Sequence, residues 1–181
     1  MESTRARAVL VMVVCAALGA VGCGSSLTDS LGGGGGNGMS ATVNGQSWSS
    51  GISTGLGSIP AVTASLLDDP STGGKQLVIT GTKTDGNTGT SISISFVSTS
   101  GFPKGSYTVV DSSGGTSHDG DAFAQVTWTN DETFDGASGT LTLGSYSSSS
   151  ASGTFQFTAR NSAGTTLNVT GGHFQSDVGA Q

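Results

Sequence analysis

The stretch Ser91-Ile92-Ser93-Ile94-Ser95-Phe96 alternates polar and apolar side chains. Successive side chains of a β-strand point to opposite faces, so the two isoleucines and Phe96 would share one face and the serines the other. A period of two predicts a strand with one buried and one solvated face, which is typical of antiparallel sheets. This stretch therefore predicts an all-β fold.

The same alternation recurs further along the chain. Thr140-Leu141-Thr142-Leu143 repeats it, and between Gly153 and Arg160 the side chains of Phe155, Phe157 and Ala159 would share one face. Weaker candidates bring the total to about eleven short strands, at residues 41–43, 46–49, 62–67, 76–82, 107–110, 122–129, 165–170 and 173–175. No segment shows the apolar spacing of an amphipathic helix.

Turn residues separate these segments. Asn44-Gly45 predicts a two-residue type I′ hairpin turn, because both residue types accept positive φ angles. Asp85-Gly86-Asn87 predicts a loop tip, and residues 161–164 predict a short hairpin connection. Gly171-Gly172 would permit a tight turn or a bulge before the last strand.

Short strands that each carry one apolar face must bury those faces against one another. We therefore expect an antiparallel β-sandwich, with a closed β-barrel as the alternative. A barrel requires the first and last strands to pair, which the sequence does not reveal, and we favour the sandwich. Residues 39–181 suffice for a single β-domain.

The N-terminus has the features of an export signal. Arg5 and Arg7 precede an apolar run of 14 residues, 8–21, which ends at the small residues Gly22 and Cys23. The run falls short of the roughly 20 residues that span a bilayer, so it predicts a cleaved signal peptide, residues 1–22. The alternatives are an uncleaved membrane anchor and a buried helix.

Ala20-Val21-Gly22-Cys23 resembles the lipobox of bacterial lipoproteins, although Ala20 replaces the usual leucine. The resemblance implies cleavage before Cys23 and lipidation of that residue, with a fatty acid such as palmitate. Gly24, in place of the aspartate that marks inner-membrane retention in Gram-negative bacteria, implies the outer membrane. The alternative is a plain secreted protein in which Cys23 is incidental.

The segment that begins at the lipidated cysteine, residues 23–38, contains five consecutive glycines and predicts a flexible tether. Its r.m.s. span is about 20 Å. Cys15 would be lost with the signal peptide and Cys23 would carry lipid, so no disulfide would remain.

The remaining chain is acidic. Without residues 1–22 it has four basic and eleven acidic side chains, a formal net charge of −7. Such a surface repels phosphate groups, which argues against nucleic acid and anionic lipid head groups as partners.

Both ends of the β-domain resemble a known group of proteins. The opening stretch is Ser40-Ala41-Thr42-Val43-Asn44-Gly45-Gln46-Ser47-Trp48. The closing stretches are Gly153-Thr154-Phe155-Gln156-Phe157-Thr158-Ala159 and Val169-Thr170-Gly171-Gly172-His173-Phe174. Together they resemble small lipoproteins of unknown function from Gram-negative bacteria, notably Bacteroidetes. The resemblance implies a lipoprotein with one β-domain. It carries over no catalytic residue.

Acidic residues gather near His118. Asp119 and Asp121 flank Gly120, and Asp131 follows at a distance. Carboxylates on loops are suitable ligands for calcium, so Asp119, Asp121 and Asp131 form a candidate metal site, although the EF-hand spacing is absent. The alternative is a set of solvated acidic loops at strand ends.

Catalytic signals are sparse. An enzyme would need a nucleophile or an acid/base pair beside an orienting group, and the only imidazoles are His118 and His173. We therefore expect a non-enzymatic protein without a cofactor, in which His173 is a strand residue. The alternative is a periplasmic hydrolase or calcium-dependent enzyme that uses Asp119, Asp121 and His118.

Four aromatic residues with polar tips, Trp48, Tyr107, Trp128 and Tyr146, form a candidate ligand platform, by analogy with β-sandwich carbohydrate-binding modules. In the expected strand, Trp128 would also lie on the same face as the apolar residues Ala122, Ala124 and Val126, which predicts a place in the core. We expect a lipid-anchored cell-envelope protein that serves in binding, adhesion or structure, with a carbohydrate or an envelope protein as candidate ligand.

Overall fold

The computed structural model describes residues 37–54, 57–59, 61–86, 88–112 and 117–179. All of these residues belong to one compact unit, Gly35–Gln181. The expected signal peptide, Cys23 and nearly all of the tether lie outside the described residues, and these expectations stay predictions.

The described residues form twelve strands and no α-helix. The strands are β1 (Gly38–Val43), β2 (Gln46–Ser49), β3 (Gly51–Thr54), β4 (Gly57–Ile59), β5 (Val62–Asp69), β6 (Gly74–Asp85), β7 (Thr88–Ser98), β8 (Gly105–Val109), β9 (Ala122–Thr127), β10 (Thr133–Tyr146), β11 (Ser150–Arg160) and β12 (Thr166–Asp177). A short 3-10 turn, η2 (Thr129–Asp131), separates β9 from β10.

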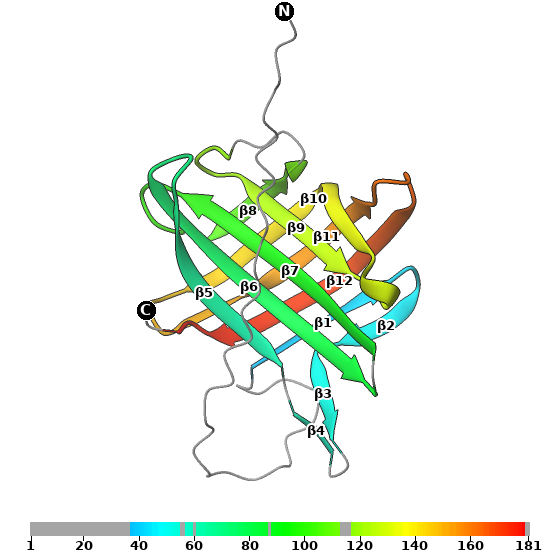
Figure 1. Ribbon diagram of the computed structural model, residues 1–181. Helices are drawn as coiled ribbons and strands as arrows, with labels where there is room; N and C mark the ends of the chain where they lie inside the picture. The colour runs from blue at the N-terminus through cyan, green and yellow to red at the C-terminus, as the bar shows by residue number, and fades with distance from the viewer. Residues whose placement is uncertain (1–36, 55–56, 60, 87, 113–116, 180–181) are drawn as a thin grey trace, which may run out of the picture. The chain divides into compact units, whose positions relative to one another are not determined.

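All of these strands belong to a single sheet, in the order β2-β1-β12-β11-β10-β8-β9-β7-β6-β3-β4, with β5 paired to β6. The pairs are antiparallel except β3–β6 and β8–β9. The sheet curls round on itself (Figure 1). Ala64 of β5 bridges to Val178, just after β12, and its carbonyl oxygen accepts a hydrogen bond of 3.1 Å from the Gly179 amide. The sheet is therefore a nearly closed barrel.

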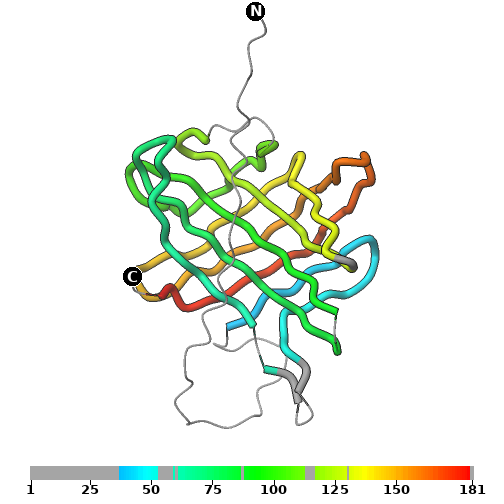
Figure 2. Tube along the Cα trace, in the orientation of Figure 1, coloured from blue at the N-terminus to red at the C-terminus, as the bar shows by residue number. Residues whose placement is uncertain are grey.

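The expected antiparallel all-β fold is confirmed. Of the two architectures expected, the curled single sheet corresponds to the β-barrel alternative and not to the favoured β-sandwich. Within this sheet the first strand, β1, pairs with the last, β12. Gly38 lies opposite Gln175, and Val43 opposite Val169. Figure 2 shows this pairing as the blue start of the domain beside its red end.

The barrel interior is filled by the apolar faces that the alternation predicts. Ile92, Ile94 and Phe96 are each at most 1 % exposed, and Leu141 and Leu143 are fully buried. Side chains of this size each contribute about 1.5–3 kcal/mol when fully buried. No membrane-spanning helix, by length and hydropathy, occurs among the residues that the structure describes.

Local backbone geometry follows the turn chemistry. Asn44 and Gly45 have φ angles of 47° and 82°, as the predicted type I′ turn requires. β12 is one strand where the sequence predicts two, because it continues through a bulge at Gly171-Gly172. A Cβ atom at Gly172 would lie 2.3 Å from the Phe155 ring, so the ring occupies the space that glycine leaves.

The hairpin β3–β4 was not predicted. Its residues are mostly glycine, serine and threonine, so they lack the alternation that identifies the other strands. It extends beyond the end of β6, with which β3 pairs in parallel at Lys83 and Thr84.

Candidate ligand-binding groove

Strands β6, β7 and β9 define two ends of the barrel. At the first, which we call the Asp69 end, β5 and β7 end while β6 and β9 begin. At the second, which we call the groove end, β6 and β9 end and β7 begins. The candidate site residues divide between these ends.

A groove of about 200 Å³ lies at the groove end. Three segments meet there: the β1–β2 hairpin, the β6–β7 hairpin and the chain that leads from β9 into η2. Both tryptophans of the chain line this groove. Their neighbours in the lining are Gln46, Ser47, Lys83, Asp85, Thr88, Thr90 and Thr129.

Trp48 is the inner residue of the pair, because only 3 % of it is exposed. Its indole Nε1 donates a hydrogen bond of 2.9 Å to the Thr90 hydroxyl oxygen. Its ring also packs beside Gly81, where an added Cβ atom would lie 3.1 Å from the indole Cη2. These contacts hold Trp48 in one orientation at the base of the groove.

Trp128 is half-buried and packs against the core, as its parity in the sequence predicts. Its amide donates a hydrogen bond of 2.8 Å to the Glu132 carbonyl oxygen across η2. Asp131 closes this turn with a φ angle of 58°, in the left-handed region that aspartate tolerates better than most residues. The turn thus positions a partly exposed indole at the groove.

The polar lining of the groove is close to neutral. Lys83 and Asp85 carry opposite charges, and the remaining polar side chains are hydroxyls and one amide. Such a lining offers both donors and acceptors without a net attraction for ions. It suits an uncharged ligand with many hydroxyl groups.

The structure places the two tyrosines of the candidate platform away from this groove. Tyr107 is buried, with its ring edge-on to Phe96 at 5.0 Å and its hydroxyl donating to the Pro103 carbonyl oxygen at 2.8 Å. Burial raises the pKa of Tyr107, and the negative charge of Asp119 raises it further. Tyr146 is half-buried against Phe102. The four rings therefore do not form one platform.

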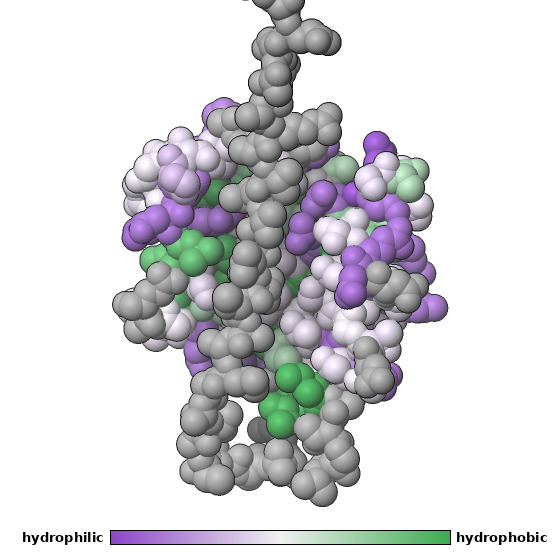
Figure 3. Space-filling view, in the orientation of Figure 1, coloured by the Kyte–Doolittle hydropathy of each residue, from purple (hydrophilic) through white to green (hydrophobic). Residues whose placement is uncertain are grey.

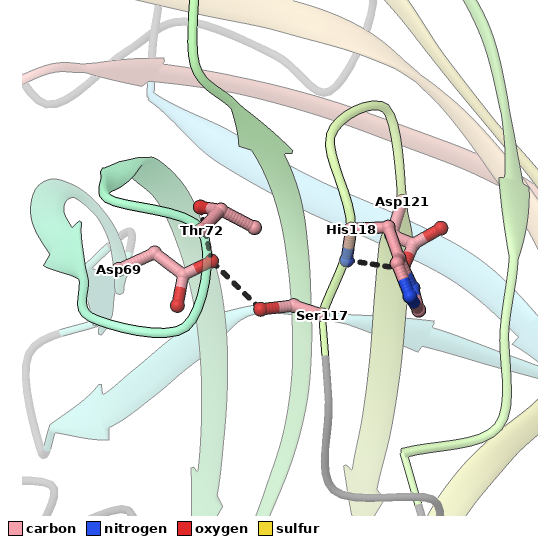
Figure 4. A network of polar contacts seen from close by, with 5 residues as sticks. All are labelled: Asp69, Thr72, Ser117, His118 and Asp121. Carbon is pink, nitrogen blue, oxygen red and sulfur yellow. Dashed lines mark hydrogen bonds and ion pairs between the residues drawn. The ribbon is translucent and has the colours of Figure 1, made fainter.

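The acidic loop at the Asp69 end is internally hydrogen-bonded. Asp119 accepts a bond of 2.7 Å from the Thr99 amide. Asp121 accepts one of 2.7 Å from the His118 amide (Figure 4). The His118 ring also approaches Asp121 at 3.3 Å, and its side chain is 76 % exposed. The two carboxylates thus hold this loop in place.

Asp131, the third candidate calcium ligand, does not join the other two. Asp121 precedes β9 and Asp131 follows it. A strand of six residues is about 20 Å long. Within the described ranges, no three His, Cys, Asp or Glu side chains gather in a way that could hold a metal ion.

Asp69, the last residue of β5, is a buried carboxylate that no local sequence pattern identifies. It is 8 % exposed and accepts a hydrogen bond of 3.0 Å from the Ser71 amide. It also accepts bonds of 2.8 Å and 2.7 Å from the hydroxyls of Thr72 and Ser117 (Figure 4). Burial alone would raise the pKa of Asp69, but the bonds from Ser117, Thr72 and Ser71 outweigh it and hold the pKa below its ordinary value. Asp69 therefore ties the β5–β6 turn to the loop before β9.

His173 lies exposed on β12, as expected for a strand residue, beside a shallow hollow over β10, β11 and β12. Gly171, Gly172 and Phe155 line the hollow together with threonine and glutamine residues of β10 and β11. No second imidazole lines it.

No family model, curated protein or solved structure matches this chain.

Proposed function

We propose that this protein is a non-catalytic binding module of the cell envelope, anchored to the outer membrane by lipid on Cys23, that binds a neutral glycan in the tryptophan groove. The observation that carries the proposal is the convergence of both tryptophans on one neutral, polar groove. The resemblance of the chain to small Gram-negative lipoproteins supports the anchor.

The chemistry of the groove favours a sugar over other small molecules. The apolar face of a pyranose ring packs on an indole, while its hydroxyl groups exchange hydrogen bonds with threonine, glutamine and charged side chains. The groove is smaller than the roughly 300–1,000 Å³ of a typical small-molecule pocket. It therefore suits the edge or terminal unit of a glycan chain.

The acidic loop does not favour the alternative, a hydrolase or calcium-dependent enzyme built on Asp119, Asp121 and His118. Both carboxylates accept backbone hydrogen bonds, and the imidazole extends into solvent. A general base must lie beside a bound substrate, and none of these three residues lines the tryptophan groove.

Intrinsic fluorescence tests the groove directly, because both tryptophans of the chain line it. Titration with a panel of neutral oligosaccharides should shift or quench the emission in a saturable way. Acidic oligosaccharides of the same length serve as controls and should have weaker effects. If no neutral sugar alters the emission or binds in calorimetry, the glycan proposal is wrong.

A matched pair of variants separates binding from stability. Trp128→Ala should weaken sugar binding by roughly tenfold, because the apolar face of the sugar ring loses the indole surface on which it is buried. Tyr146→Ala removes another half-buried aromatic outside the groove and should leave binding unchanged. Equal losses of affinity in both variants would contradict a specific groove.

The anchor is tested separately by mass spectrometry of the mature N-terminus after detergent extraction. We expect acylated Cys23, and Cys23→Ser should release the protein from the membrane fraction. An unmodified N-terminus would contradict the anchor and would indicate a secreted protein without lipid.

A further inference from the structure

The β3–β4 hairpin presents an apolar patch to solvent. Ile52 and Ile59 lie opposite each other in register and are 43 % and 53 % exposed. Side chains opposite each other in an antiparallel pair lie on the same face, so the two isoleucines form one patch. Figure 3 shows hydrophobic surface at this hairpin, at the lower end of the view.

The chain around this patch is uncharged. Residues 37–67 contain no Asp, Glu, Lys or Arg, although the domain as a whole is acidic. The nearest charges across the β3–β6 pairing are those of Lys83 and Asp85, which have opposite signs. This side of the hairpin therefore lacks the negative charge that would repel a lipid surface.

The hairpin is joined to the point where the chain enters the domain. The Met39 carbonyl oxygen accepts a bond of 2.8 Å from the Ser50 amide, and the Met39 amide donates one of 3.0 Å to the Ser50 hydroxyl. Ser50 directly precedes β3, and Met39 is the second residue of β1. A tether that arrives at β1 thus arrives at the base of the hairpin.

We propose that Ile52 and Ile59 rest in the interface of the bilayer that holds the lipidated Cys23. This inference depends on the proposed anchor. Two isoleucines are a small patch for a free protein. A tether of about 20 Å, however, makes their contact with the bilayer intramolecular and raises its effective concentration into the millimolar range.

Contact through the hairpin would orient the domain. β3 pairs with β6 at Lys83, which also lines the tryptophan groove. The groove would therefore be held beside the lipid head groups, with the Asp69 end directed outward. The ligand chemistry that fits this position is a neutral glycan displayed close to the membrane surface.

Hydrogen exchange read by mass spectrometry tests the contact. The protein is purified from the membrane of cells that process it and is reconstituted in phosphatidylcholine vesicles. We compare the wild type with the double variant Ile52→Ser/Ile59→Ser and with Leu67→Ser. Leu67 is the other large hydrophobic residue exposed among the described residues, at 38 %. The same peptide map reports whether Cys23 carries lipid.

On vesicles, amide hydrogens in β3 and β4 of the double variant should exchange fastest. In the wild type and in Leu67→Ser the same amides should exchange roughly fivefold to tenfold more slowly, after correction for intrinsic rates. Equal exchange in all three proteins would overturn the inference. If Cys23 carries no lipid, the anchor proposal is wrong. In that case, slower exchange in β3 and β4 on added vesicles would still support contact between the hairpin and the bilayer. Unchanged exchange would contradict it.

Discussion

The two ends of the barrel use polar residues in opposite ways. At the Asp69 end, the carboxylates of Asp69, Asp119 and Asp121 accept hydrogen bonds from the protein itself and hold loops in place. At the groove end, Lys83, Asp85 and several hydroxyls line an open groove beside two tryptophans. The residues that look most reactive in the sequence thus have structural contacts, and the groove proposed to bind a ligand lies at the other end.

Removing the Asp69 carboxylate should produce the largest effect. Asp69→Ala leaves the Ser117 and Thr72 hydroxyls without their acceptor. We expect a loss of about 2–4 kcal/mol in the free energy of unfolding, since bonds to a charged group are stronger than neutral ones. Chemical denaturation measures the change.

The adjacent Asp68 provides the control. Its side chain is 84 % exposed and pairs with Lys75 at the surface. Asp68→Ala should therefore cost less than about 1 kcal/mol. Equal losses at the two positions would mean that the Asp69 end is not held by its buried carboxylate.

The pH dependence of stability sharpens the same contrast. The folded protein holds the pKa of Asp69 below its ordinary value, so the ionised group stabilises the fold above the unfolded pKa, near pH 4. This contribution is lost as pH falls through the lower folded pKa. The stability difference between the wild type and Asp69→Asn should therefore shrink below about pH 4. A difference that grows with acid would contradict the assignment.

A smaller effect is expected at the groove end from Thr90→Val. The substitution removes the acceptor of the Trp48 indole N–H and should cost about 1–2 kcal/mol. Thr88→Val is the matched control, because the Thr88 hydroxyl bonds only at an exposed turn. Thermal unfolding and tryptophan emission would both register the change at Thr90, and an unaltered emission maximum would argue against the bond.

Calcium should have the smallest effect. The Asp119 and Asp121 carboxylates already accept backbone bonds, and Asp131 lies at the opposite end of β9. We expect millimolar calcium to change Tm by less than about 1 °C. A concentration-dependent rise of several degrees would show that the acidic loop rearranges around an ion.

Local alternation was enough to predict most of the sheet. Ile92, Ile94 and Phe96 are buried as their spacing predicts, and Asn44-Gly45 makes the predicted turn. These features depend on neighbours in sequence. β3 and β4 were missed because their short, glycine-rich segments carry no alternation.

The site was harder to predict because its contacts are distant in sequence. Trp48 bonds to Thr90 and faces the same groove as Trp128, and Asp69 bonds to Ser117 across 48 positions. No local pattern encodes such pairings. The sequence identified both tryptophans as candidates, but only the curled sheet separates them from Tyr107 and Tyr146.

The pairing of β1 with β12 limits the order in which the strands of the sheet can form. The meander from β10 to β12 joins neighbours in sequence, whereas β1 must wait for a partner some 130 residues downstream. Until β12 has been synthesised, the edge of β1 that pairs with it remains open to other chains. We therefore expect the β1–β12 pairing to form late in folding, after the local hairpins.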